Sequence, residues 1–195
     1  RRQRQMCIRD RLTPMVATAR LIKQEHPDAS VVFIGPCASK KLEASRRTVR
    51  SDVDFVITFE ELTGMFEAKG ILLDEIKAMD EMKDATAAGR GYGVAGGVAN
   101  AIKECIEQYY PGTPVNIQHA ESLAECKKAL LLAKAGKMNG CLIEGMACPG
   151  GCIAGAGTNI AIPVAARAVD KFKNEAEKKV PDESVDQEMV ELEKE

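Results

Sequence analysis

The sequence predicts an α/β fold in which a mostly parallel sheet carries helices on both faces. Two observations lead to this prediction. Short apolar runs rich in β-branched residues, which are typical of buried strands, recur along the chain. Segments with apolar residues at helical spacing lie between these runs. Because strands and helices alternate, each helix can return the chain to the same end of the sheet, so that neighbouring strands run parallel.

The first half of the chain supplies two of the predicted strands. In chain order we expect a helix over 14–26, a strand over 31–34, a strand over 54–58, a helix over 60–69 and further helical turns within 74–83. Gly35 and Pro36 end the first strand. Thr58 is the expected N-cap of the second helix, with Glu61 at the capping-box position.

The second half opens with a glycine-rich stretch over 87–98. In order, we then expect a helix over 99–110, a strand over 115–117, an amphipathic helix over 122–134, a strand over 141–144 and a helix over 163–179 that begins with proline. Ligands of open α/β sheets lie beyond the carboxyl ends of the strands. The residues that follow strands 31–34 and 141–144 are therefore candidates for a functional site.

The chain reads as one domain over residues 12–179, with a different segment at each end. Residues 1–11, RRQRQMCIRDR, are strongly basic and fit poorly with the rest of the sequence. The MCIRDR stretch resembles translated sequencing-adapter sequence, so we set this segment aside as foreign, together with Cys7. Residues 180–195 are acidic and polar, and we expect a disordered tail there.

Composition argues against several classes of function. A net charge of −2 without a basic stripe argues against nucleic-acid binding, and an aromatic content of 4% without Trp removes the stacking platforms that single strands need. No apolar run is long enough to cross a bilayer, and no hydrophobic signal region opens the chain. We therefore expect a soluble cytoplasmic protein without membrane insertion. In that compartment, seven cysteines indicate metal binding or redox chemistry rather than a disulfide framework.

The strongest local signal is the pair Cys148 and Cys152, which enclose Pro149-Gly150-Gly151. Two thiols four residues apart can converge on one iron–sulfur cluster if the backbone between them curls tightly. Gly150 and Gly151 permit that curl, and we expect their N–H groups to lie close enough to hydrogen-bond cluster sulfurs. One alternative is a turn with two inert, buried cysteines. Another is zinc, although structural zinc sites usually show paired short-spaced motifs.

Cys37 is the third candidate ligand, because it directly follows the strand over 31–34. If strands 31–34 and 141–144 run parallel, its thiol can meet the other two at one end of the sheet. Lys40 could place an ammonium group beside an anionic ligand there. A 4Fe–4S cluster normally takes four thiolates, so three leave the site one ligand short. The remaining candidates are expected to pack in the core or to have no ligand role: Cys105, Cys126, Cys141, His26 and His119.

At these positions the sequence resembles the FeFe (iron-only) hydrogenases, in the C-terminal part of the large subunit. GPCASKKLE over 35–43 is similar to the second active-site block of that family, MPCxxKxxE. LIEGMACPGGCIAGAG over 142–157 is similar to the third block, FxExMACxGGCxxGGG. DVDFVIT over 52–58 and GGV over 96–98 also resemble family segments, so the resemblance extends over most of the chain.

The resemblance implies an H-cluster site and an oxidoreductase. Cys37, Cys148 and Cys152 would ligate its 4Fe–4S cubane, and Cys152 would bridge to a di-iron subsite that carries CO, CN and a bridging dithiolate. Lys40 would hydrogen-bond a cyanide of that subsite, and Met146 would pack beside it. The implied reaction is reversible H2 oxidation and proton reduction, with a ferredoxin-like electron carrier or upstream iron–sulfur domains as partners.

Departures from the family pattern leave alternatives open. The first block of the family, TSCCP, is absent, and it supplies the fourth cubane ligand and a proton-relaying thiol. We therefore expect a chain that is truncated at its start and inactive by itself. Gly35 replaces a methionine of the second block, while Ala154 and Ala156 depart from the third. The alternatives are an H2-sensing regulatory hydrogenase, a non-catalytic 4Fe–4S protein of the cluster-assembly type, and a plain metal-stabilised module.

Overall fold

The computed structural model describes residues 12–45, 52–77 and 85–179, which form helices and short parallel strands. Short 3-10 turns cover Leu73–Glu75, Gly91–Gly93 and Cys152–Ala154. The helices and strands are α2 (Pro14–Glu25), β1 (Val32–Ile34), α3 (Ser39–Ser45), β2 (Phe55–Ile57), α4 (Phe59–Ala68), α5 (Ala87–Arg90), α6 (Gly97–Tyr109), β3 (Asn116–Glu121), α7 (Leu123–Lys134), β4 (Cys141–Met146) and α8 (Ile162–Asn174). The predictions for residues 1–11 and 180–195 fall outside the described residues.

The described strands form two parallel pairs, β1 with β2 and β3 with β4. Val32 lies opposite Phe55 in the first pair, and Asn116 lies opposite Cys141 in the second. The predicted α/β class with parallel strands is confirmed. The strands are divided between two sheets, however, where the sequence pattern had suggested one. Which strands pair is decided by contacts between distant segments, and periodicity within a segment carries no information about that choice.

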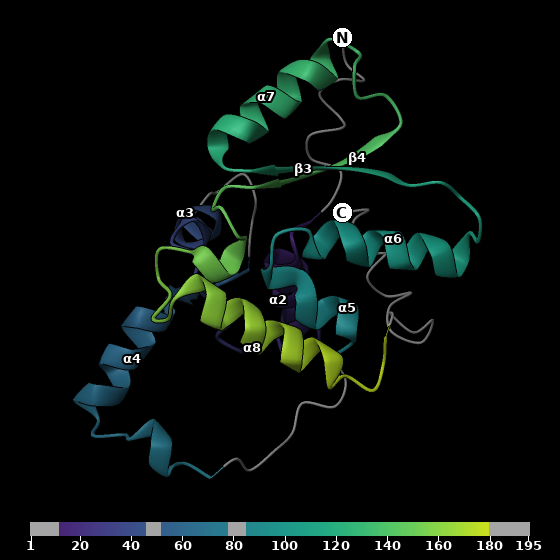
Figure 1. Cartoon of the computed structure of the whole chain (residues 1–195). Helices are drawn as coiled ribbons and strands as arrows, with labels where there is room; N and C mark the ends of the chain where they lie inside the picture. The colour runs from purple at the N-terminus through teal and green to yellow at the C-terminus, as the bar shows by residue number, and fades with distance from the viewer. Residues whose placement is uncertain (1–11, 46–51, 78–84, 180–195) are drawn as a thin grey trace.

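The pair β3–β4 lies between two helices, α7 on one face and α6 on the other (Figure 1). Both strands are longer than predicted. Gln118 and His119 are both polar, so this part of β3 lacks the alternation of apolar and polar residues by which a strand is predicted from sequence. The ladder with β4 holds these residues extended all the same, since its register continues to Glu121 opposite Met146.

The pair β1–β2 packs on α2. Met15, Val16 and Ala19 of that helix form a buried cluster with Val31 and Val53. Asp54 supports the same junction, because its carboxylate accepts a hydrogen bond from the Val31 N–H at 2.7 Å and pairs with Lys23 at 2.9 Å. The core therefore fixes the amino ends of β1 and β2. It leaves the loops at their carboxyl ends available to contribute residues to a site.

The start of α4 has the predicted capping box. The Thr58 hydroxyl accepts from the Glu61 N–H at 3.2 Å, and the Glu61 carboxylate accepts from the Thr58 N–H at 2.8 Å. Lys41 of α3 adds an ion pair to the same carboxylate. Together these contacts lower the pKa of Glu61 from 4.5 to about 2, with the Lys41 hydrogen bond as the largest cause and the Thr58 backbone next.

We expect Glu61→Gln to destabilise the chain at pH 7 and to have no effect in strong acid. The folded-state pKa of Glu61 lies below its ordinary value, so the stabilisation is present above about 4.5 and is lost as the pH falls towards about 2. Urea denaturation followed by circular dichroism at stepped pH measures this loss. Glu67→Gln is the matched control, because Glu67 is an exposed residue of the same helix. A constant difference between wild type and Glu61→Gln across that pH range would contradict the prediction.

Three further elements differ from expectation. The spacing of apolar residues did not predict α3. None of its residues is buried, and the segment lacks the apolar stripe by which a helix is predicted from sequence. The short helix α5 lies inside the glycine-rich stretch, where propensity is low. Of the helical turns expected within 74–83, the structure shows only Leu73–Glu75, and residues 78–84 lie outside the described part. No helix in the described ranges is long and apolar enough to cross a membrane.

Candidate metal centre

The turn between Cys148 and Cys152 directly follows β4 and curls as predicted. Gly150 and Gly151 have φ of +93° and +90°, which other L-residues rarely adopt. The Gly151 N–H donates to the Cys148 carbonyl at 3.0 Å, which closes the turn. This curl is the local geometry that brings two thiols four residues apart toward one side of the chain.

The glycine-rich stretch before α6 packs directly against this turn. A Cβ on Gly151 would lie 2.5 Å from the Ala95 nitrogen and 2.8 Å from the Gly93 carbonyl oxygen, so the two backbones are in direct contact. The Ala95 N–H donates to the Gly150 carbonyl at 3.1 Å. The backbone of Gly93, Val94 and Ala95 thus forms the surface on which the cysteine turn lies.

One expectation about this turn is wrong. We expected the N–H groups of Gly150 and Gly151 to be available to cluster sulfurs. In the structure the Gly150 N–H donates to the Glu121 carboxylate at 2.9 Å, and the Gly151 N–H donates to Cys148. These glycines therefore shape the turn, and their N–H groups are used within the protein.

Cys37 reaches the same region because the loop after Cys152 packs on the loop after β1. The Gly157 N–H donates to the Pro36 carbonyl at 3.0 Å, and a Cβ on Gly155 would lie 2.3 Å from that same oxygen. The loop also binds the start of α4, where the Glu60 N–H donates to the Gly157 carbonyl at 3.2 Å. A backbone-to-backbone contact between segments more than 100 residues apart therefore brings Cys37 to the other two cysteines.

Gly155→Ala is expected to separate Cys37 from Cys152. The added methyl group meets a backbone carbonyl that cannot rotate away, and overpacking of this kind costs about 1–3 kcal/mol of stability. We expect weaker uptake of iron and sulfide, measured by absorbance after reconstitution. Gly64→Ala is the control, because a Cβ at Gly64 of α4 meets nothing within 4 Å and alanine favours a helix. Equal uptake by both variants would contradict the role of the Gly155–Pro36 contact.

Several titratable groups act on the Cys152 thiol. The pKa of Cys152 is raised, first by partial burial of its thiol and then by the charges of Cys37 and Cys148. Lys40 opposes this shift, and Glu144 adds to it. In the described ranges, no three His, Cys, Asp or Glu side chains are close enough to hold one metal ion. A cubane offers a separate iron to each thiolate, whereas one zinc ion gathers all of its ligands on a single atom.

Lys40 lies in the first turn of α3, three residues after Cys37. Its ammonium group pairs with Glu43 at 2.6 Å, and both side chains are about three-quarters buried, at 24% and 23% exposed. Glu43 also accepts a hydrogen bond from the Thr13 hydroxyl, which ties α3 to the start of α2. Lys40 is thus held near the cysteines by a residue that closes the same sequence block.

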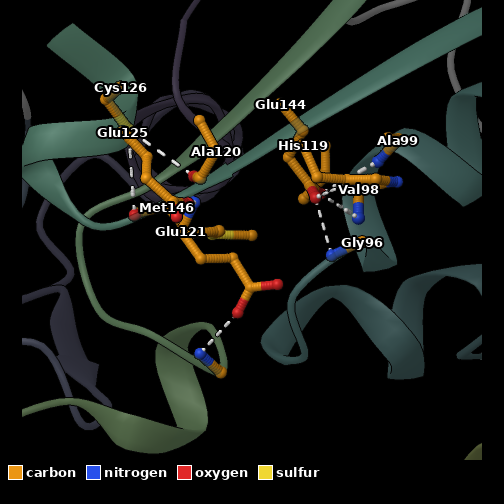
Figure 2. A network of polar contacts seen from close by, with 11 residues as sticks. Gly96, Val98, Ala99, His119, Ala120, Glu121, Glu125, Cys126, Glu144 and Met146 are labelled. Atoms are coloured by element: carbon orange, nitrogen blue, oxygen red, sulfur yellow. Dashed lines mark hydrogen bonds and ion pairs between the residues drawn. The ribbon is translucent and has the colours of Figure 1, made fainter. Parts of the chain in front are cut away.

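Glu144 is a site residue that sequence analysis did not predict. It is buried in the middle of β4, and its carboxylate accepts hydrogen bonds from three backbone N–H groups at the start of α6, those of Gly96 at 2.6 Å and of Val98 and Ala99 at 3.1 Å. His119, its register partner on β3, pairs with it at 3.0 Å (Figure 2). Glu144 therefore connects the cysteine-bearing strand to the glycine-rich stretch.

The other cysteines lie away from this centre. Cys126 of α7 packs against Gly145, with its thiol directed at the carbonyls of Ala120 and Met146 (Figure 2). Burial is the first cause that raises the pKa of Cys105 on α6, followed by the charge of Glu104. Both residues are only partly buried and lie outside the buried core, where core packing was expected. Met146, at the end of β4, lies beside Glu121.

Comparison with known proteins decides the family. The model of the iron only hydrogenase large subunit, C-terminal domain, matches residues 6–156. The chain belongs to this family. Membership of the hydrogenase family implies binding of an iron–sulfur cluster. The match begins inside the segment over 1–11, so the boundary proposed there stays a prediction.

Solved hydrogenases share the fold of this hydrogenase-family chain. FeFe-hydrogenase HydA1 from Chlamydomonas reinhardtii superposes with a TM-score of 0.62 at 21% identity, over 85% of this chain and 60% of that one. HydA(deltaEFG), whose structure revealed stepwise H-cluster assembly, gives a TM-score of 0.59 at 22% identity over the same shares. At such identity the likeness concerns the fold. The chain spans 60% of the length of these hydrogenases.

A curated relative is the cytosolic Fe-S cluster assembly factor NAR1 of Kluyveromyces lactis. It is 43% identical over 53 residues, which are 27% of this chain and 11% of the relative. The chain therefore resembles proteins with two different tasks, hydrogen conversion and cluster assembly.

Proposed function

We propose that this chain holds a 4Fe–4S cluster through Cys37, Cys148 and Cys152, as the cubane half of an H-cluster that acts on H2. The observation that carries the proposal is the packing of the loop after Cys152 on the loop that holds Cys37, where the Gly157 N–H donates to the Pro36 carbonyl at 3.0 Å. The soft thiolate set and the backbone surface under the turn fit such a cluster.

The residues of the chain supply position and charge. When bound, the cluster with its di-iron subsite supplies the redox chemistry that interconverts H2 with protons and electrons. Lys40 provides a cation beside the thiolates, and Glu43 orients it. Met146, at the end of β4, would line the site, and Cys152 would hold both the cubane and the di-iron subsite. A ferredoxin-like carrier is the proposed electron partner.

Cluster assembly is the second candidate function, because the similarity to NAR1 favours it. Such a protein would keep the cubane and carry no di-iron subsite. An H2-sensing hydrogenase with little turnover is a variant of the first candidate. Lys40 favours the hydrogenase readings, since a bare cubane gives no reason for an ammonium group positioned beside the bridging thiolate.

Infrared spectroscopy separates the candidates. The full-length product of the gene is reconstituted with iron and sulfide, a synthetic di-iron complex is added, and the CO and CN stretching bands are recorded together with H2 turnover. Bands with turnover support the hydrogenase, and bands with slow turnover support the sensor. A cubane absorbance without bands supports the assembly type. If no cluster absorbance develops at all, every one of these proposals is rejected.

A further inference from the structure

Glu121 touches the cysteine turn from a neighbouring strand. It is the last residue of β3, and its side chain extends toward the loop that follows β4 (Figure 2). Its carboxylate accepts the Gly150 N–H at 2.9 Å, midway between Cys148 and Cys152. The Glu121 backbone is itself fixed, because its N–H donates to Glu125 of α7 at 2.7 Å. A rigid strand end therefore presents this carboxylate.

Gly150, whose N–H binds Glu121, has a hydrogen-bond partner for each of its two backbone polar groups. The Gly150 N–H donates to Glu121 and its carbonyl accepts from Ala95, so both polar backbone groups are engaged. Gly150 has φ of +93°, a conformation that glycine visits freely and holds only at an entropic cost. A hydrogen bond to a carboxylate is about twice as strong as a neutral one, so Glu121 is the stronger of the two restraints.

We propose that Glu121 is a positioning residue for the cluster, which fixes the turn between Cys148 and Cys152 and lowers the reduction potential of the iron it carries. This inference rests on the proposed function. A carboxylate next to the turn opposes the arrival of an electron, and the nearby cation Lys40 is already paired with Glu43. The other carboxylate near Cys152, that of Glu144, is engaged by α6 and His119.

Two variants separate the hydrogen bond from the charge. Glu121→Gln keeps an oxygen that can accept the Gly150 N–H and removes the charge, whereas Glu121→Ala removes both. Glu107→Gln on the exposed face of α6 is the matched control for charge. In the chain without metal, we expect amide exchange at Gly150, followed by NMR, to be about tenfold faster or more in Glu121→Ala and close to wild type in Glu121→Gln.

In the reconstituted chain, both Glu121 variants are expected to shift the reduction potential to a more positive value, while Glu107→Gln leaves it unchanged. Unchanged exchange at Gly150 in Glu121→Ala would overturn the positioning role, and an unmoved potential in Glu121→Gln would overturn the effect of charge. A wild-type chain that takes up no cluster rejects the proposed function and with it the effect on the potential. The exchange measurement needs no cluster and still decides the positioning role.

Discussion

Replacement of Cys148 or Cys152 by serine is expected to abolish the cluster absorbance of the reconstituted chain. Serine keeps the size of the side chain and removes the soft thiolate that iron requires. Because the proposed ligand set has three thiolates, the loss of one leaves two, and we expect at least a tenfold loss of bound iron and sulfide. Visible absorbance and iron and sulfide determination measure this loss.

Cys105→Ser is the control for this prediction. Cys105 lies on α6, and burial is the main cause of its raised pKa. We expect it to retain full cluster absorbance. Retained absorbance in Cys152→Ser, or equal loss in Cys105→Ser, would show that the ligand set is wrong.

Glu144→Ala is expected to lower the free energy of unfolding by about 2–4 kcal/mol. Gly96, the N-cap of α6, provides no side-chain cap, so the Glu144 carboxylate satisfies the N–H groups at the start of this helix instead. Alanine leaves these donors without an acceptor in a buried place. Urea denaturation followed by far-ultraviolet circular dichroism measures the loss.

Two matched variants identify which contact matters. Glu144→Gln keeps one oxygen for the helix N-terminus and should lose roughly half as much stability. His119→Ala removes only the side-chain hydrogen bond, in which the histidine is 44% exposed, and should cost less than about 1 kcal/mol. If His119→Ala costs as much as Glu144→Ala, the contact with His119 and not the helix cap is the source of stability.

The parts of the site that the sequence could predict are the local ones. The curl between Cys148 and Cys152 follows from two adjacent glycines, and the capping box of α4 follows from Thr58 and Glu61 three residues apart. Both features depend on residues within one turn of the chain, where propensity and spacing determine the outcome.

The remaining features depend on contacts between distant segments. Glu121 and Glu144 bind backbone N–H groups. Because every residue except proline has such a group, the sequence does not show which of them a carboxylate will bind. The prediction that N–H groups of this turn bind cluster sulfurs was wrong for the same reason, because the Gly150 N–H donates to Glu121, which lies on another strand. Cys37 was predicted to join the site, but the Gly155–Pro36 contact that brings it there could not be predicted from the sequence.

The packing of Gly155 on Pro36 and of Gly151 on Ala95 has a consequence for the order of maturation. These contacts close loops of more than 50 residues, which form slowly because their chain entropy is lost before any contact rewards it. During folding, the local turn with Cys148 and Cys152 therefore forms before Cys37 is brought to it. Cluster insertion into the folded chain then acts as ligand binding to the native state, so the loaded protein should melt at a higher temperature than the empty one.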